Sequence, residues 1–359
     1  MTRVLHVTRD FPPRTNGGIS TAVGGMVRVL RAAGTPVAVV SFDGYRPRAS
    51  GVAGAPERGE GVLRVAVPAH LPEARAFARS FAPQVVHVHH GMLWDFAAAL
   101  GVPCVATIHV AQAEQNRLRG ITEETLSLRG QRALLAGAHR VLAPSQTVAD
   151  LLVADEPSLA SRLRVSRLAA DAPDTVVAPN PSGPILYAGR FADINGIAEL
   201  FEVATRVDAR FVVAGGLPDN PKSEARWRGR APAGVELTGW LGRDDLEARY
   251  AEASIVVVPS WFETFGLVAL EAMHRGRAIV ATTGGALAEL LEHDRTALLS
   301  APRDIDGLVA NLDALVRNPE RARELGAAAA EQARAHWCWE QRVDELLETY
   351  ATCTAAQGS

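Results

Sequence analysis

The sequence predicts a protein of two α/β domains, each built on a parallel β-sheet with helices on both faces. The chain has 359 residues, of which 48% are hydrophobic and 21% are charged, so it carries enough apolar material for two cores. Short apolar runs of strand length alternate with longer amphipathic stretches in both halves of the chain. This alternation is interrupted once, by a proline-rich stretch at residues 171–184.

Strands are expected in the first half at residues 4–8, 37–42, 62–67, 85–89, 105–109 and 140–143. Helix-length segments lie between them, as at residues 20–33 and 122–136. Residues 44–61, rich in glycine, proline and arginine, are expected to form a mobile loop.

The pattern restarts beyond the proline-rich stretch, with expected strands at residues 185–188, 211–215, 235–238, 255–259 and 278–282. Residues 318–350 are expected to be helical. We therefore expect a first domain over residues 1–178 and a second over residues 179–335. Residues 336–359 are expected to form a C-terminal helix and tail that pack back on the first domain.

Composition excludes several classes of partner and compartment. The net charge of −3 gives no field that would favour nucleic acid or a membrane surface. The three cysteines, Cys104, Cys338 and Cys353, are far apart in sequence and none pairs with a histidine at metal-ligand spacing, which favours a reduced cytoplasmic protein. No signal peptide and no apolar run of membrane-spanning length are evident.

The strongest functional motif occupies residues 259–272, which read PSWFETFGLVALEA. An apolar strand leads into a short loop and then into good helix formers, and the free N–H groups of a helix N-terminus bind phosphate. Gly266 would allow a ligand close to the backbone. Glu271 lies ~7 Å further along the helix and would reach ribose hydroxyls, while Glu263 in the loop would hold sugar hydroxyls. Taken singly, either glutamate could instead be a surface acid near a helix start.

This motif resembles the signature of the retaining GT-B glycosyltransferases of family four, in which two glutamates are separated by seven residues and Phe-Gly follows the first. Other stretches resemble further motifs of that family in the same order: residues 11–18 with a double glycine, 86–89, 106–109, Gly189-Arg190, 237–241, and 283–285 with Glu289. The resemblance covers nearly the whole chain, although each short stretch other than the two-glutamate motif is weakly specific.

The resemblance implies a GT-B fold of two Rossmann-like domains facing across a cleft, with a C-terminal helix that crosses back to the first domain. It implies a retaining glycosyltransferase that moves a sugar from a nucleoside-diphosphate sugar onto an acceptor, with no cofactor besides that co-substrate. No acidic triplet of the kind that binds a metal–nucleotide complex is evident, so we expect no metal requirement. The first domain has no obvious basic amphipathic helix of the kind that docks on membranes, so we expect a small soluble acceptor such as a specialised metabolite. The catalytic residues implied are His109, Arg190 and Glu263. The donor-binding residues implied are Gly17, Gly18, Asn195, Trp240, Leu241, Thr264, Phe265, Gly266, Leu267 and Glu271.

Several of these residues also have simpler interpretations. Gly17 and Gly18 could form only a turn, and the absence of Gly-x-Gly-x-x-Gly there argues against a dinucleotide oxidoreductase. His109 ends an apolar run, where a lone histidine is more often a hydrogen-bonded core residue. His87, His89 and His90 could suggest metal ligands, but no carboxylate or cysteine accompanies them, so we expect a structural His87 and a cleft-lining His89.

One position departs from the family pattern. Five residues after Arg190, where the family has a lysine that neutralises the departing diphosphate, this chain has Asn195. Removing such an electrostatic donor typically costs ~3–4 kcal/mol. Arg190 with Lys222, the only lysine, or a nearby arginine could compensate, or the donor could be unusual, or the protein could be weakly active or silent. The alternatives to a transferase are therefore a non-catalytic nucleotide-sugar binding protein and a GT-B sugar-nucleotide epimerase.

Overall fold

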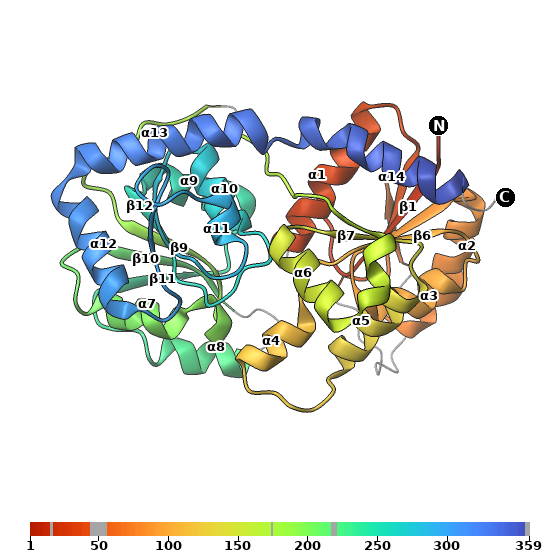
Figure 1. Ribbon diagram of the computed structural model, residues 1–359, viewed down its shortest axis with the longest axis horizontal. Coiled ribbons are helices and arrows are strands. Elements are labelled where there is room, and N and C mark those ends of the chain that lie inside the picture. Colours follow the sequence, from red (N-terminus) through yellow and green to blue (C-terminus); the bar gives the residue numbers. More distant parts are fainter. Residues whose placement is uncertain (15–16, 44–55, 174, 217–220, 356–359) are drawn as a thin grey trace. The chain divides into compact units, whose positions relative to one another are not determined.

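A computed structural model describes residues 1–14, 17–43, 56–173, 175–216 and 221–355 (Figure 1). The chain forms two compact units. Unit 1 combines Met1–Leu168 with Trp339–Ser359, and unit 2 is Ala169–Cys338.

Unit 1 contains an eight-stranded sheet in the order β3-β4-β2-β1-β5-β6-β7-β8. All its strand pairs are parallel except β3 with β4. In chain order the strands are β1 Val4–Thr8, β2 Val37–Ser41, β3 Glu57–Gly59, β4 Val62–Arg64, β5 Val85–Val88, β6 Cys104–Thr107, β7 Arg140–Ala143 and β8 Leu163–Val165. All six strands expected from the sequence are present, and the order reverses direction between β1 and β5.

The helices of unit 1 are α1 Gly18–Ala32, α2 Leu71–Phe81, α3 Trp94–Ala98, α4 Gln112–Leu118, α5 Leu126–Gly137, α6 Gln146–Asp155 and α14 Val343–Ala355. Helix α5 starts later than the expected residue 122 because Thr125 caps it, with its hydroxyl accepting the Leu128 N–H at 3.2 Å. The expected loop at residues 44–61 is only partly described: residues 44–55 lie outside the described residues, and residues 57–59 form the exposed strand β3.

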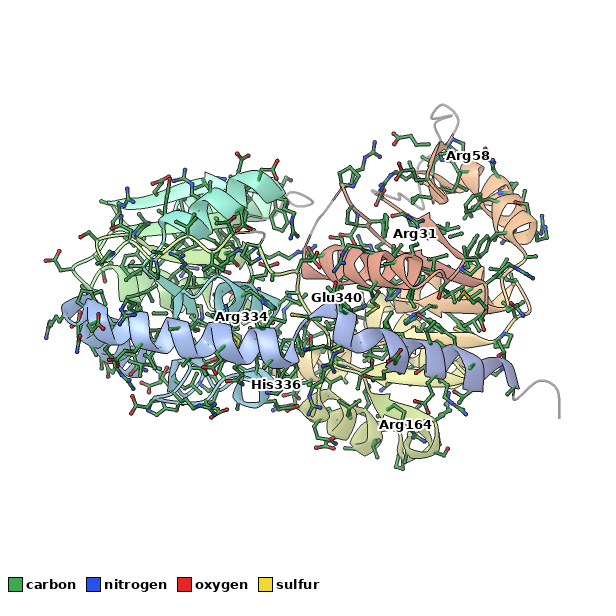
Figure 2. The ribbon with its side chains drawn as sticks, turned by 90° about the horizontal axis from the view of Figure 1, so that it is seen from above. Arg31, Arg58, Arg164, Arg334, His336 and Glu340 are labelled. Carbon is green, nitrogen blue, oxygen red and sulfur yellow. The ribbon has the colours of Figure 1, made fainter. Side chains whose placement is uncertain are left out.

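The expected return of the C-terminal helix to the first domain is confirmed. Trp339 is buried, and a Cβ added to Gly25 of α1 would lie 2.0 Å from its indole nitrogen, so the helix and the ring fit only because residue 25 has no side chain. The Tyr350 hydroxyl lies 2.8 Å from His87 Nδ1 on β5. Figure 2 shows α14 running beside α1, with Glu340 near it; Glu340 accepts a hydrogen bond from Arg28 at 2.9 Å.

Unit 2 contains a six-stranded, wholly parallel sheet in the order β11-β10-β9-β12-β13-β14. Its strands are β9 Ile185–Arg190, β10 Phe211–Gly216, β11 Val235–Gly239, β12 Ile255–Val258, β13 Ala278–Thr282 and β14 Leu298–Ser300. Its helices are α7 Ile197–Ala204, α8 Pro221–Arg228, α9 Arg243–Glu252, α10 Leu267–His274, α11 Leu287–Leu290, α12 Ile305–Arg317 and α13 Pro319–His336. The strand order reverses between β9 and β12, which is where open parallel sheets bind ligands.

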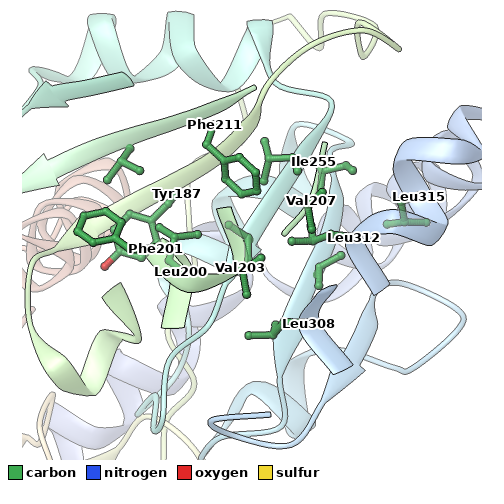
Figure 3. Close-up of a cluster of buried hydrophobic side chains, with 14 of the residues drawn as sticks. Tyr187, Leu200, Phe201, Val203, Val207, Phe211, Ile255, Leu308, Leu312 and Leu315 are labelled. Carbon is green, nitrogen blue, oxygen red and sulfur yellow. The ribbon is translucent and has the colours of Figure 1, made fainter. Parts of the chain in front are cut away.

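The core of unit 2 is apolar. Figure 3 shows that Tyr187 of β9, Phe211 of β10, Leu200 of α7 and Leu312 of α12 belong to one cluster of buried side chains. These side chains are at most a few per cent exposed, so burying them stabilises the sheet and the two helices together.

The boundaries between the units differ from those expected at residues 178 and 335. The linker belongs to unit 2 from Ala169 onward, because its backbone is held there: the Ala170 N–H donates to the Trp337 carbonyl at 3.2 Å, and Arg277 donates to the Val177 carbonyl. The helical structure expected over residues 318–350 is present as α13, a 3-10 turn at Trp339–Arg342 and α14, but it is not one continuous helix. It is interrupted between His336 and Val343, where the chain passes from unit 2 to unit 1.

In the part of the chain that the structure describes, no helix combines the length and the apolar character needed to cross a membrane.

Candidate functional site

The loops that follow β9 and β12 meet at the carboxyl edge of the unit 2 sheet. The Trp261 N–H donates to the Ile194 carbonyl at 2.8 Å. Gly196 has a φ of 71°, and a Cβ there would lie 2.0 Å from the Pro259 carbonyl oxygen. This approach is open only to glycine, and it places the loop carrying Arg190 and Asn195 directly against the two-glutamate motif.

Gly266 precedes helix α10 with a φ of 99°, and a Cβ there would lie 2.8 Å from Leu287 Cδ2. The expected helix start is therefore present, with the free N–H groups of α10 at the carboxyl edge of the sheet. Phe265 is buried beneath the loop, whereas Thr264 and Leu267 are half-buried. The loop after β13 lies alongside it, because the Glu263 N–H donates to the Gly284 carbonyl at 3.2 Å and the Ala286 N–H to the Glu263 carbonyl at 2.8 Å.

Glu263 is half-buried in this loop. Its Oε1 accepts a hydrogen bond from the Ser260 hydroxyl at 2.8 Å, and Ser260 itself is buried. Burial raises the pKa of the Glu263 carboxyl, and the Ser260 hydrogen bond opposes this rise. Ser260 was not among the predicted site residues, although its position three residues before Glu263 in the motif could have indicated the contact.

Glu271 lies on α10, and its Oε2 accepts a hydrogen bond from the Tyr250 hydroxyl at 2.9 Å. Burial raises the pKa of the Glu271 carboxyl, while the Arg275 charge and the Tyr250 hydroxyl lower it. Tyr250 and Arg275 were missed by the sequence prediction. No local pattern pairs a tyrosine on α9 with a glutamate 21 residues later; only the fold brings them together.

The cations near these loops are arginines. Arg190 ends β9, is exposed, and lies in register with Gly216 of β10. Asn195 ends a short 3-10 turn, Asp193–Asn195, and is half-buried. Arg303, which the sequence prediction missed, places its guanidinium carbon 3.7 Å from the ring centroid of Trp261 in the motif.

The predicted base-binding residues Trp240 and Leu241 follow the edge strand β11 and are half-buried. They share the carboxyl edge of the sheet with Arg190, and β10 separates β11 from β9. Lys222 lies on α8, which follows β10.

In unit 1, Gly17 and Gly18 open helix α1 after β1, at the point where the strand order reverses. Gly17 has a φ of 151°, and its carbonyl accepts the Ser20 hydroxyl at 2.7 Å. Residues 15 and 16 of the same motif lie outside the described residues. A helix N-terminus at this edge can bind an anion, as expected from the double glycine.

His109 follows β6 and ends a chain of buried imidazoles. His6 Nδ1 lies 3.0 Å from His89 Nε2, and His89 Nδ1 lies 3.0 Å from His109 Nε2. Burial lowers the pKa of His6 and of His109 to about 3 each, and it lowers the pKa of His89 well below 6.5, so these rings are neutral at pH 7. The expectation that His89 lines a cleft is wrong, because only 2% of it is exposed and both its nitrogens face other histidines.

Among the described residues, the nitrogens of His6, His87 and His89 lie within 4.8 Å of one another, a spacing at which three ligands could hold a metal ion. Their hydrogen bonds favour a different arrangement. His87 lies 2.8 Å from the Tyr350 hydroxyl and 2.7 Å from the Thr107 hydroxyl, so a metal would have to displace one of these partners. This pairing agrees with the structural role expected for His87.

Each unit has a glycine at a helix start, at the point where the strand order of its sheet reverses. Two units of this kind define a nucleotide-binding α/β protein of the Rossmann-like class. The family described as Glycosyltransferase Family 4 matches residues 16–168, and Glycosyl transferases group 1 matches residues 183–318. The chain belongs to this glycosyltransferase family, and its fold is of the GT-B type.

Relatives support this assignment over most of the chain. The alpha-maltose-1-phosphate synthase of Mycolicibacterium smegmatis is 28% identical over 98% of this chain and 100% of its own length. The D-inositol 3-phosphate glycosyltransferase of Pseudarthrobacter chlorophenolicus is 28% identical over 74% of this chain and 70% of its own length.

Solved structures show the same fold. The sucrose-phosphate synthase of Thermosynechococcus elongatus has a TM-score of 0.84 at 20% identity, and the match covers 99% of this chain and 100% of that one. Anabaena HepE, determined in complex with UDP and glucose, has a TM-score of 0.77 at 15% identity over 98% of this chain and all of that one.

The buried imidazoles predict how the stability of unit 1 depends on pH. Their folded pKa values lie below the unfolded value of about 6.5, so the unfolded chain binds more protons below that pH. The free energy of unfolding should be level above about pH 6.5 and fall below it by up to about 1.4 kcal/mol per pH unit for each histidine.

Urea titrations at several pH values, with pulsed hydrogen exchange reporting on unit 1 peptides, would measure this slope. His6→Leu should reduce the slope. If the free energy of unfolding of the wild type did not change between pH 6.5 and 5, the assignment of these buried histidines as neutral would be contradicted.

Proposed function

We propose that this chain is a retaining, metal-independent glycosyltransferase that transfers a sugar from a nucleoside-diphosphate sugar to a small soluble acceptor. One observation carries the proposal: the two-glutamate loop opens helix α10 at the carboxyl edge of the unit 2 sheet, with the Arg190–Asn195 loop packed against it. Helix N–H groups, an arginine and two glutamates are the partners that a diphosphate and its neighbouring hydroxyls require.

Each part of the donor has a partner in this arrangement. The N–H groups at Gly266 and the Arg190 guanidinium take up the diphosphate charge, which is the charge that grows as the sugar leaves. Glu271 binds the ribose hydroxyls and Glu263 the sugar hydroxyls. From unit 1 we assign His109 to the sugar and Gly17 and Gly18 to the phosphates.

The proposed reaction retains configuration at the anomeric carbon. The bond from that carbon to the phosphate oxygen breaks, and the bond to the acceptor oxygen forms on the same face. The acceptor's proton goes to the phosphate oxygen that departs, so no side-chain base is needed. Electrostatic stabilisation of the leaving diphosphate is then the main contribution of the protein.

The acceptor is proposed by comparison with the relatives. One relative is named as the synthase of alpha-maltose 1-phosphate and the other as a glycosyltransferase of D-inositol 3-phosphate, and both compounds are small and strongly polar. A small soluble acceptor, including a specialised metabolite, fits that class. We place the reaction in the cytoplasm, where Cys104, Cys338 and Cys353 would remain the free thiols that they are in this structure.

The first prediction from this proposal is that a nucleoside diphosphate such as UDP or GDP stabilises the protein. Ligand at ~100 Kd should add ~2.7 kcal/mol to the free energy of unfolding, and Glu271→Ala should remove most of that gain. Thermal-shift measurements over a nucleotide panel would test this, with Glu320→Ala, an exposed glutamate on α13, as the matched control. If no nucleoside diphosphate raises the melting temperature of the wild type, the transferase proposal fails.

The second prediction concerns metal independence. Because arginine and helix N–H groups are assigned to the diphosphate, initial rates of sugar transfer should be unchanged in EDTA. Rates lost on chelation and restored by Mn²⁺ or Mg²⁺ would show that a metal ion, rather than Arg190, neutralises the leaving group.

Asn195 supports a second candidate function, a nucleotide-sugar binding protein with little or no turnover. Its side chain carries no charge, and its turn lies against the two-glutamate motif, since the neighbouring Ile194 carbonyl accepts the Trp261 N–H. The family's lysine position is therefore beside the motif but without its cation. The candidate epimerase is distinguished by consumption of a UDP- or GDP-sugar in the absence of any acceptor.

Asn195→Lys separates these functions. If the phosphate site is an ordinary one that lacks a cation, the lysine should tighten diphosphate binding about tenfold and raise the rate, because charge-assisted hydrogen bonds are the stronger ones. Nucleotide affinity and initial rate would be measured with one donor panel for wild type, Asn195→Lys and the uncharged control Asn195→Gln. Loss of both quantities in Asn195→Lys alone would indicate a site adapted to another donor. Tighter binding without turnover in any variant would favour the binding protein.

A further inference from the structure

Each of the two glutamates in the motif has one carboxylate oxygen held by a hydroxyl group. Ser260 donates to Glu263 Oε1 at 2.8 Å, and Tyr250 donates to Glu271 Oε2 at 2.9 Å. Within the described residues, the second oxygen of each carboxylate accepts no hydrogen bond. Each glutamate is thus fixed at one carboxylate oxygen, and its other carboxylate oxygen is left for a ligand. Tyr250 differs from Ser260 in that it lies on another helix than the glutamate it holds.

Tyr250 is itself held rigidly. It is 1% exposed, and the guanidinium carbon of Arg275 lies 4.7 Å from the centroid of its ring. Arg275 Nε lies 2.9 and 3.0 Å from the two carboxylate oxygens of Glu247, which precedes Tyr250 by one turn on α9. A second Arg275 nitrogen donates to the Glu271 backbone carbonyl at 2.7 Å. Helix α9 therefore holds the Glu271 carboxylate through Tyr250, and it holds Arg275 at the end of α10 through Glu247.

We propose that Tyr250 is a positioning residue for nucleotide binding: its hydroxyl orients the Glu271 carboxylate so that the second oxygen receives the ribose hydroxyls. This inference rests on the proposed function. A glutamate side chain that is ordered before the ligand arrives does not lose its rotamer freedom on binding. A hydroxyl donor also favours the ionised carboxylate, which is the form that accepts hydrogen bonds from a diol.

A purely structural role predicts something different. A buried hydroxyl needs a partner in any case, so Tyr250→Phe could lower stability and leave ligand recognition unchanged. The two roles are separated by asking whether the variant loses affinity specifically for the ribose hydroxyls. Tyr250→Phe suits this test because it keeps the ring beneath Arg275 and removes only the hydroxyl.

The experiment measures, by calorimetry on the full chain, the Kd of the nucleoside diphosphate that binds the wild type, of its 2′,3′-dideoxy analogue, and of pyrophosphate. Tyr250→Phe should weaken the parent nucleotide about tenfold and leave the dideoxy analogue and pyrophosphate unchanged. With the donor sugar, KM should rise by a similar factor while kcat stays the same, since ribose contacts are equal in the ground and transition states.

Tyr350→Phe is the matched control. It removes a buried tyrosine hydroxyl bonded to His87 in unit 1, so it should lower the melting temperature and leave all three Kd values unchanged. Glu247→Gln provides a second variant at a partly exposed position in case Tyr250→Phe does not fold. By releasing Arg275 from its carboxylate, it should reduce the preference for the parent nucleotide over the dideoxy analogue several-fold.

The positioning role would be overturned if Tyr250→Phe bound the parent nucleotide in preference to the dideoxy analogue by the same factor as the wild type. If only Glu247→Gln folds, the same result in that variant would overturn it. So would an equal loss of affinity for the parent nucleotide and the dideoxy analogue. These results leave the proposed function intact, because the wild type still binds nucleotide. If the wild type binds no nucleoside diphosphate, the proposed function fails first, and the inference fails with it.

Discussion

The candidate site in unit 2 depends on the close approach of two loops at Gly196. A Cβ at this position would lie 2.0 Å from the Pro259 carbonyl oxygen, and the positive φ of 71° adds a second reason for glycine. Because this approach is possible, the loop after β9 stacks directly on the loop after β12. Arg190, Asn195 and the two glutamates thereby come from segments about seventy residues apart and still share one edge of the sheet.

The two units differ in how they hold polar groups near their candidate sites. In unit 2 the two half-buried glutamates accept hydrogen bonds from hydroxyl groups, as Glu271 does from Tyr250. In unit 1 the polar groups are neutral imidazoles in a chain, and His6 Nε2, at the inner end, is buried without a hydrogen-bond partner among the described residues. A buried ring nitrogen left unpaired costs stability, so His6 Nε2 lowers the stability of unit 1.

Much of this architecture could be predicted from the sequence, because strand-length apolar runs and the two-glutamate motif are local patterns. The runs that became β1, β7, β12 and β13 were located nearly residue by residue. Strands β3, β8 and β14 were missed because each has only three residues, too few to show a strand pattern. The hydrogen bond from Tyr250 to Glu271 and the chain from His6 to His109 join distant segments, so no local spacing could have revealed them.

The return of residues 339–355 to unit 1 makes that unit discontinuous in sequence, with the whole of unit 2 inserted into it. During synthesis, unit 2 can complete its core as a continuous segment, whereas unit 1 must wait for Trp339 and Tyr350 to fill the space beside Gly25 and to meet His87. The core of unit 1, most of which is synthesised first, is thus completed by residues 339–355, which are synthesised last. A chain that ends within unit 2 would leave Gly25 of α1 without the Trp339 ring against it and His87 of β5 without the Tyr350 hydroxyl.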